Sequence, residues 1–358
     1  GDQLARAGKI EHVQALPRGT EMSSLKARGA PCVFRTTAEL ALAPVRVARA
    51  WFEPVAHVPP RIRLPPRAAS RIGIAFDSAL PARILHGRGL PRLRLHVDGD
   101  GLLAAALIDA LGMNVVETWV EAEGMEGWRR LDGAVLQLGG LEPEEALVPE
   151  QDHAHPAYRL LTEYFAFPDK FHFLDVDLAR LAPLLPAGAR RFTLHFLLTG
   201  MHAESGPARI LRALSAANLL TGCVPVVNLF RQAAAPVRIT HRSAMYDVAP
   251  SRHEEGVEVY TIDAVHVLRT EDRKTASVEY RPYYGLRHGE GGDGGQHGQR
   301  YWFAHRDDSG DSRHRMKIAF TDDDFSLQGE DASVASIDLT CSNGAAACGV
   351  GVGAPGGD

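Results

Sequence analysis

The sequence has few cysteines and no long apolar run. Its four cysteines are Cys32, Cys223, Cys341 and Cys348, and only the last two are near neighbours, with six residues between them. Zinc ligands usually come as closely spaced pairs, and disulfide frameworks need a higher density of cysteine. The spacing therefore predicts free thiols in a reducing cytoplasm. Because no run of eighteen apolar residues occurs, no transmembrane helix is expected.

The chain also lacks an excess of positive charge and any known catalytic motif. Its net charge of −5 predicts neither a nucleic-acid partner nor insertion into an anionic membrane. No nucleophile elbow, phosphate-binding loop or dinucleotide fingerprint occurs. No leader of charged and then apolar residues precedes the first segment, which begins Gly-Asp-Gln without an initiator Met. The 358 residues, 45% of them hydrophobic, suffice for two or three domains with their own cores.

Four polar segments contain residue types that could do chemistry, but each has a simpler interpretation. Asp98–Gly101 begins like a calcium loop, yet lacks the glycine and glutamate that such a loop needs further on. Ser205 precedes a helix pattern, where serine is usually a cap. The others are polar stretches without a fixed ligand geometry: Asp152-His153-Ala154-His155 with His288 and His297, and Asp322–Asp324. We therefore assign no catalytic, cofactor-binding or metal residue.

Short strands separated by Gly, Pro and Asp dominate the pattern. Strands are expected at Ala48–Phe52, Arg71–Phe76, Arg92–Val97, Val115–Val120, Arg191–Leu198 and Glu258–Leu268. Two helices are expected, at Leu102–Leu111 after the capping carboxylates and at Ala208–Leu220, with Gly222 just past its end. The fold class is mainly β (α+β), with several β-sandwich or β-rich domains and a few inserted short helices.

Three polar or proline-rich stretches suggest domain boundaries. They are the two Pro-Pro pairs within 58–67, the Glu-, Pro- and His-rich segment 141–155, and the Gly-rich segment 288–299. We expect a partial β-rich domain at 1–64, a β-rich domain with one helix at 65–150, an α+β domain at 151–342 and a disordered Gly/Ala tail at 343–358.

The densest aromatic segment runs from His155 to Phe173. Tyr158, Leu161, Tyr164 and Phe165 recur at helical spacing, and an aromatic strand ending in Phe173 is expected to follow. Because exposed aromatic clusters are uncommon, the pattern predicts a buried cluster of Tyr164, Phe165 and Phe171. On that interpretation Phe165→Ala would cost about 3–5 kcal/mol.

Several segments resemble a known family. Tyr158–Leu161, Glu163–Phe165, Phe167–Phe171 and Cys223–Phe230 (CVPVVNLF) resemble the signature segments of the TssF family (also called VasA or ImpG), a baseplate subunit of the bacterial type VI secretion system. Five further segments match in the family's order: Leu16–Thr20, Cys32–Thr36, Val97–Asp100, Glu258–Asp263 and Asp338–Asn343.

This resemblance implies a structural role in the baseplate wedge, with no enzymatic activity and no cofactor. It implies assembly with TssG, TssE, TssK and further TssF copies around the spike hub, where the wedge supports the sheath. The expected location is the cytoplasm, at the baseplate docked to the inner membrane, without direct insertion into it. The family extends further at both ends, so a central fragment is expected, and the resemblance stops after Asn343.

Two other classes of function remain open from the residues alone. A β-sandwich that binds carbohydrate would use tryptophan platforms such as Trp51, Trp119, Trp128 and Trp302. Only 7% of residues are aromatic and the tryptophans do not cluster in the sequence, which disfavours this alternative. A hydrolase would need a titrating group in a cleft. For a baseplate subunit the candidate interface anchors are Trp128, Tyr283-Tyr284 and Trp302.

Overall fold

The computed structural model describes residues 12–24, 31–148, 155–240, 243–252, 256–271, 274–283, 300–307, 315–322 and 333–350. These residues form two compact units. The first lies within Gly1–Thr20 and Thr36–Val226, and the second within Glu21–Arg35 and Val227–Gly353. Neither the Pro-rich stretch 58–67 nor the described part of the polar segment, 141–148, separates the two units, because both lie inside the first. The finer division into four parts stays a prediction.

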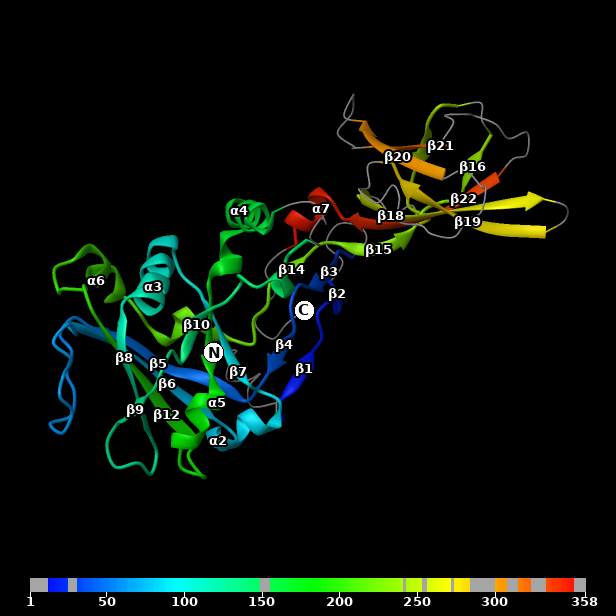
Figure 1. Ribbon diagram of the computed structural model, residues 1–358. Coiled ribbons are helices and arrows are strands. Elements are labelled where there is room, and N and C mark those ends of the chain that lie inside the picture. The colour runs from blue at the N-terminus through cyan, green and yellow to red at the C-terminus, as the bar shows by residue number, and fades with distance from the viewer. Residues whose placement is uncertain are drawn as a thin grey trace. The chain divides into compact units, whose positions relative to one another are not determined.

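The predicted fold class, mainly β with short helices, is confirmed (Figure 1). The first unit has three sheets, in the orders β1-β4, β10-β11-β7-β13 and β5-β6-β12-β8-β9. Their strands are β1 (Gln14–Leu16), β4 (Leu40–Leu42), β5 (Val45–Glu53), β6 (Ser70–Ser78), β7 (Arg92–Val97), β8 (Val115–Ala122), β9 (Arg129–Leu131), β10 (Leu136–Leu138), β11 (Phe173–Asp177), β12 (Arg191–Leu198) and β13 (Leu219–Thr221).

Short helices connect these strands. The α-helices are α2 (Ala82–Leu85), α3 (Gly101–Met113), α4 (Pro156–Ala166), α5 (Leu178–Leu181) and α6 (Gly206–Leu211). The 3-10 turns are η1 (His86–Arg88), η2 (Pro143–Glu145), η3 (Pro168–Phe171), η4 (Ala182–Leu184) and η5 (Ala216–Asn218). No helix among the described residues is long and apolar enough to cross a membrane.

One core joins the four-stranded and five-stranded sheets of the first unit. Alternate residues of β6 and β12, including Ile72, Ile74 and Phe196, point to the same side and are almost completely buried. The helices α3 and α6 contact each other and pack on this sheet with Leu107 and Leu211 (Figure 1). Because one face of each sheet is committed to this core, polar residues remain on the opposite faces.

The two predicted helices have different outcomes. The first is confirmed as α3, whose N-terminal amides on Leu102 and Leu103 donate to the Asp100 carboxylate at 2.9 and 2.8 Å. The second is too long as predicted, because α6 ends at Leu211. A capping box of Ser215 and Asn218 then starts η5, and the following residues form β13, which pairs with β7. After Leu211, the capping of η5 and the pairing of β13 with β7 outweigh the apolar helical pattern that predicted a helix up to Leu220.

The second unit is a sheet structure with its own core. One sheet has the order β14-β3-β2, and the larger one has the order β15-β22-β18-β19-β20-β21-β17, with β16 also paired to β22. Its elements are β2 (Glu21–Ser23), β3 (Val33–Thr36), β14 (Val226–Val227), β15 (Phe230–Ala233), β16 (Val237–Ile239), β17 (Tyr246–Val248), β18 (Glu258–Glu271), β19 (Lys274–Pro282), β20 (Arg300–Asp307), β21 (Arg315–Asp322), β22 (Ser333–Ser342) and α7 (Ala345–Cys348).

All six predicted strands are present. Arg92–Val97 and Arg191–Leu198 have the predicted bounds, and the other four extend by a few residues within β5, β6, β8 and β18. The described part of the predicted disordered tail is structured. Asn343 is buried and α7 follows it, whereas 351–358 lie outside the described residues, as do 288–299.

Three of the family-like segments meet at one pair of asparagines in the second unit. The Asn228 side chain donates to the side-chain oxygen of Asn343 at 2.8 Å and to the Val33 carbonyl at 2.8 Å. In return, the Asn343 backbone amide donates to Asn228 Oδ1 at 2.7 Å, and the Val33 amide donates to Asn343 Oδ1 at 2.9 Å. Since each asparagine both donates and accepts, this pair holds β3 beside the ends of β15 and β22.

We predict that Asn228→Ala destabilises the second unit by about 1–3 kcal/mol, because it leaves buried backbone groups without partners. Hydrogen exchange followed by mass spectrometry should show faster exchange in β3, β15 and β22, with β6 and β12 of the first unit unchanged. The near-isosteric Asn228→Asp keeps the shape but removes the donor, so it should be at least as destabilising. If Asn228→Asp is neutral, the hydrogen bonds are not what holds β3.

Candidate interaction surface

The helix α4 exposes its apolar face, contrary to the prediction that this segment is core. Tyr158, Leu161, Tyr164 and Phe165 are 68%, 56%, 55% and 80% exposed. The aromatic rings do form the predicted cluster, because Tyr164 lies 5.7 Å from Phe165 and 5.8 Å from Phe171 between ring centroids. The residues after the helix form η3 rather than a strand. The cluster therefore exists, but on the surface.

The opposite face of α4 is polar and buried. Arg159 and Glu163 lie one turn apart and form an ion pair at 3.1 Å, with side chains 9% and 7% exposed. Glu163 also pairs with Lys170 of η3, which is completely buried, and accepts from the Leu147 amide at 2.8 Å. Burial lowers the pKa of Lys170, and the pairing with Glu163 opposes this effect. The helix is thus attached to the unit by charges.

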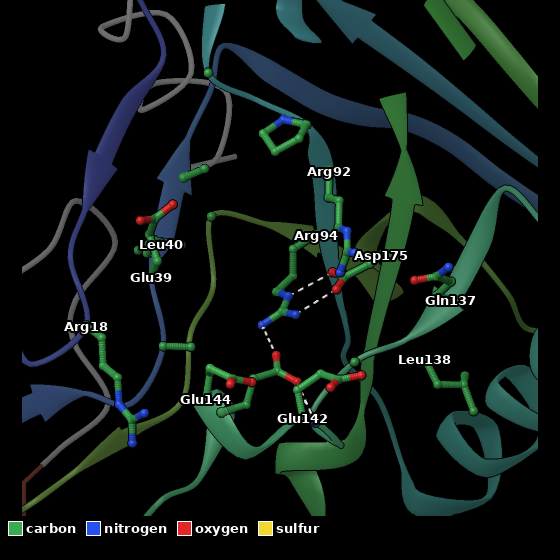
Figure 2. A pocket seen from close by; sticks show the side chains of 17 residues that line it. Arg18, Glu39, Leu40, Arg92, Arg94, Gln137, Leu138, Glu142, Glu144 and Asp175 are labelled. Carbon is green, nitrogen blue, oxygen red and sulfur yellow. Dashed lines mark hydrogen bonds and ion pairs between the residues drawn. The ribbon is translucent and has the colours of Figure 1, made fainter. Parts of the chain in front are cut away.

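The same charge layer continues onto the outer face of the four-stranded sheet. Arg94 of β7 and Asp175 of β11 are register partners, and Arg94 donates two hydrogen bonds to Asp175 at 2.8 and 2.6 Å (Figure 2). Arg94 also pairs with Glu145 of η2 at 2.5 Å. Burial acts to lower the pKa of Arg94, but its bonds to Asp175 and Glu145 outweigh this and raise it. Three cations and three carboxylates are therefore paired in this charge layer: Arg94, Arg159, Lys170, Glu145, Glu163 and Asp175.

Gly140 allows the backbone beside this charge layer to pack closely against Lys170. Its φ of +86° is in the left-handed region, and a Cβ built there would lie 2.3 Å from the Lys170 carbonyl oxygen. The Gly140 amide donates to Glu145 at 2.8 Å. Only a residue without a side chain lets the backbone at position 140 approach the Lys170 carbonyl this closely while its amide donates to the Glu145 carboxylate.

An acidic cavity of about 460 Å³ lies beside this layer (Figure 2). Its charged lining consists of Arg18, Arg92 and Arg94 and of Glu39, Glu142, Glu144, Glu145 and Asp175. Because the carboxylates outnumber the arginines, and Asp175 and Glu145 are already paired with Arg94, the remaining charge of the cavity is negative. The cavity is better suited to a cationic side chain than to an anion.

We predict that Lys170→Met costs about 3–5 kcal/mol of unfolding free energy, because it leaves the buried Glu163 carboxylate short of a partner. Phe165→Ala should cost less than about 1 kcal/mol, since the ring is exposed. Asp169→Asn, an exposed neighbour in η3, is the control and should be neutral. Urea unfolding checks all three, and a large loss for Phe165→Ala with none for Lys170→Met would contradict the assignment of faces.

A second polar layer covers the outer face of the five-stranded sheet, and it brings together three tryptophans that are scattered in the sequence. Trp51, Gly73, His195 and Trp119 are successive register partners across β5, β6, β12 and β8. Trp128 stacks on His195 with ring centroids 3.7 Å apart. The tryptophans do not cluster in the sequence but do cluster in space, because strand pairing joins residues that are far apart in sequence.

These tryptophans are engaged within the layer. Their indole N–H groups donate to Glu53, Glu117 and Glu121, and a Cβ at Gly73 would lie 2.3 Å from the Trp51 ring. Cations lie over them as well, with Arg49 4.6 Å from the Trp51 ring centroid and Arg71 4.9 Å from that of Trp128. This arrangement is typical of a packed polar-aromatic layer rather than of open rings that wait for a sugar.

His195 lies at the centre of that layer and is 2% exposed. Burial, and then the Arg71 guanidinium at 3.2 Å from Nδ1, lowers the pKa of His195 to about 3. The imidazole is therefore neutral in the folded protein at neutral pH, whereas it titrates near its ordinary pKa of about 6.5 in the unfolded chain.

We predict that this difference makes the first unit less stable in acid. Below about pH 6.5 the unfolded chain binds a proton that the folded one does not, so stability falls by about 1.4 kcal/mol per pH unit until the folded pKa is reached. His195→Gln should lose less stability than the unmodified protein between pH 6.5 and 4.5, measured by urea unfolding. Equal pH slopes for the two proteins would contradict the neutral buried imidazole.

The polar residues weighed from the sequence act as helix caps. Asp100 caps α3, His155 Nδ1 accepts from the Ala157 amide at 3.2 Å, and Ser205 Oγ accepts from the Ala208 amide at 3.3 Å. Among the described residues no group of three His, Cys, Asp or Glu side chains could hold a metal. Asp322 ends β21, and the following residues lie outside the described part, as do His153, His288 and His297.

The cysteines and the other candidate anchors have ordinary packing environments. All four cysteines are free thiols, as predicted. Trp302 packs partly buried against the core of the second unit, and Tyr283 lies edge-on to Tyr301. Tyr284 lies outside the described residues. The surface that sequence reasoning missed is that of α4, although Arg159 and Glu163 at i and i+4, opposite the aromatics, gave a signal for it.

Comparisons with known proteins agree with the segments noted in the sequence. The family model described as "Type VI secretion system, TssF" matches residues 3–358. Type VI secretion system component TssF1 of Pseudomonas aeruginosa is 28% identical over 275 residues, which are 72% of this chain and 40% of that protein. A chain of the cryo-electron-microscopy structure of the type VI secretion system TssK-TssF-TssG baseplate subcomplex has a TM-score of 0.72 and 25% identity.

That match covers 94% of this chain and 57% of the other. This chain thus spans about half the length of the relatives it matches. The chain belongs to the TssF family of type VI secretion system proteins.

Proposed function

We propose that this protein is a structural subunit of the type VI secretion baseplate and binds TssG and TssK. The observation that carries the proposal is the similarity, over 94% of the chain, to a chain of a TssK-TssF-TssG baseplate subcomplex. The exposed aromatic face of α4 supports it, because a large apolar patch on a soluble protein usually marks an interface.

The proposal includes the wider setting of such a subunit. We propose assembly with TssE and with further copies of the family around the spike hub, in the cytoplasm, at a baseplate docked to the inner membrane and near the sheath. It also includes the absence of catalysis. Lys170 and His195, two groups with perturbed pKa values, are buried under other side chains, which is typical of structural ion pairs and not of an accessible reaction site.

Carbohydrate binding remains the alternative, and the tryptophan layer on the five-stranded sheet is the one observation in its favour. Arg49 lies over the Trp51 ring, and His195 and Arg71 contact the Trp128 ring, so a sugar would have to displace these contacts. We therefore rank carbohydrate binding second, after the baseplate role.

Copurification tests the two functions against each other. The tagged 358-residue chain, coexpressed with TssG and TssK of the same source, should retain both through size-exclusion chromatography. A glycan array with the purified chain is the parallel measurement and should be empty. A monomeric chain that ignores TssG and TssK but binds a glycan, and loses that glycan in Trp119→Ala, would replace the baseplate role with the alternative.

A further inference from the structure

The anchors on α4 have the spacing of a helix that enters a groove. Tyr158, Leu161 and Phe165 lie at positions i, i+3 and i+7, with Tyr164 beside them, and all four are more than half exposed. In helix-in-groove recognition an amphipathic helix places side chains at these positions in an apolar groove of its partner. The buried ion pairs of Arg159 and Glu163 fix the other side of α4, so the anchors are presented in a defined orientation.

The exposed area is large enough for a specific contact. Aromatic side chains present about 150–250 Å² each, so three rings that are half to four-fifths exposed offer roughly 300–500 Å². That equals the largest apolar patch on a typical monomer. Among the described residues of the range 138–167, four further large apolar residues are also exposed: Leu138, Leu141, Val148 and Phe167.

The two segments that carry this patch expose more carboxylates than cations. In the described residues 136–148 and 155–171 the only cations are Arg159 and Lys170, and both side chains are buried against Glu163. The carboxylate of Asp169 is 60% exposed and lies 3.3 Å from His172 Nδ1. Glu142 and Glu144 are exposed beside the acidic cavity, which Arg18 and Arg92 also line. The buried layer thus retains the positive charge and leaves carboxylates at the rim.

We propose that α4 inserts its aromatic face into an apolar groove of a partner protein whose rim carries Lys or Arg. The proposal rests on the baseplate function and names the chemistry of the contact. A second copy of this chain fits poorly, because a symmetric pair would place the same carboxylates opposite one another. An anionic membrane surface would be repelled for the same reason.

The first test is the double variant Leu161→Asp/Phe165→Asp. Both side chains are exposed, so the variant should fold, as circular dichroism and urea unfolding would verify. Its affinity for purified TssK–TssG, measured by biolayer interferometry, should fall at least about 30-fold, as expected for interface hot spots. Leu102→Asp, at an equally accessible residue (71% exposed) on α3, is the matched control and should bind like the unmodified chain.

The second test addresses the charge at the rim. Glu144→Lys/Asp169→Lys should weaken binding several-fold at low salt, and the difference should shrink as salt screens the charges. A charge-neutral apolar groove would leave this variant unaffected and overturn the basic rim.

The outcomes separate the two proposals. If the unmodified chain binds TssK–TssG but the Leu161/Phe165 variant binds as well as Leu102→Asp, α4 is not the contact and the baseplate function stands. If the unmodified chain binds neither protein, both proposals fail. A dimer seen by light scattering that disappears in the Leu161/Phe165 variant would assign the face to a second copy and overturn the inference.

Discussion

The buried ion pairs that hold α4 determine which face of this helix the first unit exposes. Arg94 pairs with Asp175 and Glu145 and connects β7, β11 and η2, while Arg159 and Lys170 pair with Glu163 and connect α4 to η3. An apolar contact could have held this helix only by using its aromatic face. Because buried charges must be paired, the polar face of α4 is directed inward, and the aromatic face is left outside.

This arrangement explains why the sequence predicted the elements well and the burial of α4 poorly. The periodicity of Tyr158, Leu161 and Phe165 predicts the helix, but it does not predict whether its apolar face points into the core or toward the outside. The direction depends on the partners of Glu163, which are the buried Lys170 of η3 and the backbone amide of Leu147, and the helical pattern shows neither. The alternating strands, by contrast, needed only local pattern, and β7 and β12 were predicted to the residue.

The other misjudged features also depend on pairing at long range. Trp51 and Trp119 became neighbours of His195 through the register of four strands, which the sequence does not encode in any local window. The end of α6 was misplaced because Leu219–Thr221 pairs with β7. Conversely, the family-like segments were informative beyond their local pattern, since Val33, Asn228 and Asn343 meet through hydrogen bonds between segments far apart in the chain.

The close packing of Gly140 on Lys170 bears on when, during folding, the aromatic face of α4 becomes exposed. This close approach to Lys170 forms only when η3 packs against the segment around Gly140. Until then Glu163 lacks its buried partner Lys170, and an early α4 would gain most by turning its rings toward any apolar surface available. The aromatic face is therefore exposed in this orientation only when this part of the chain has folded. A partner that binds the face would then prefer folded subunits to nascent ones.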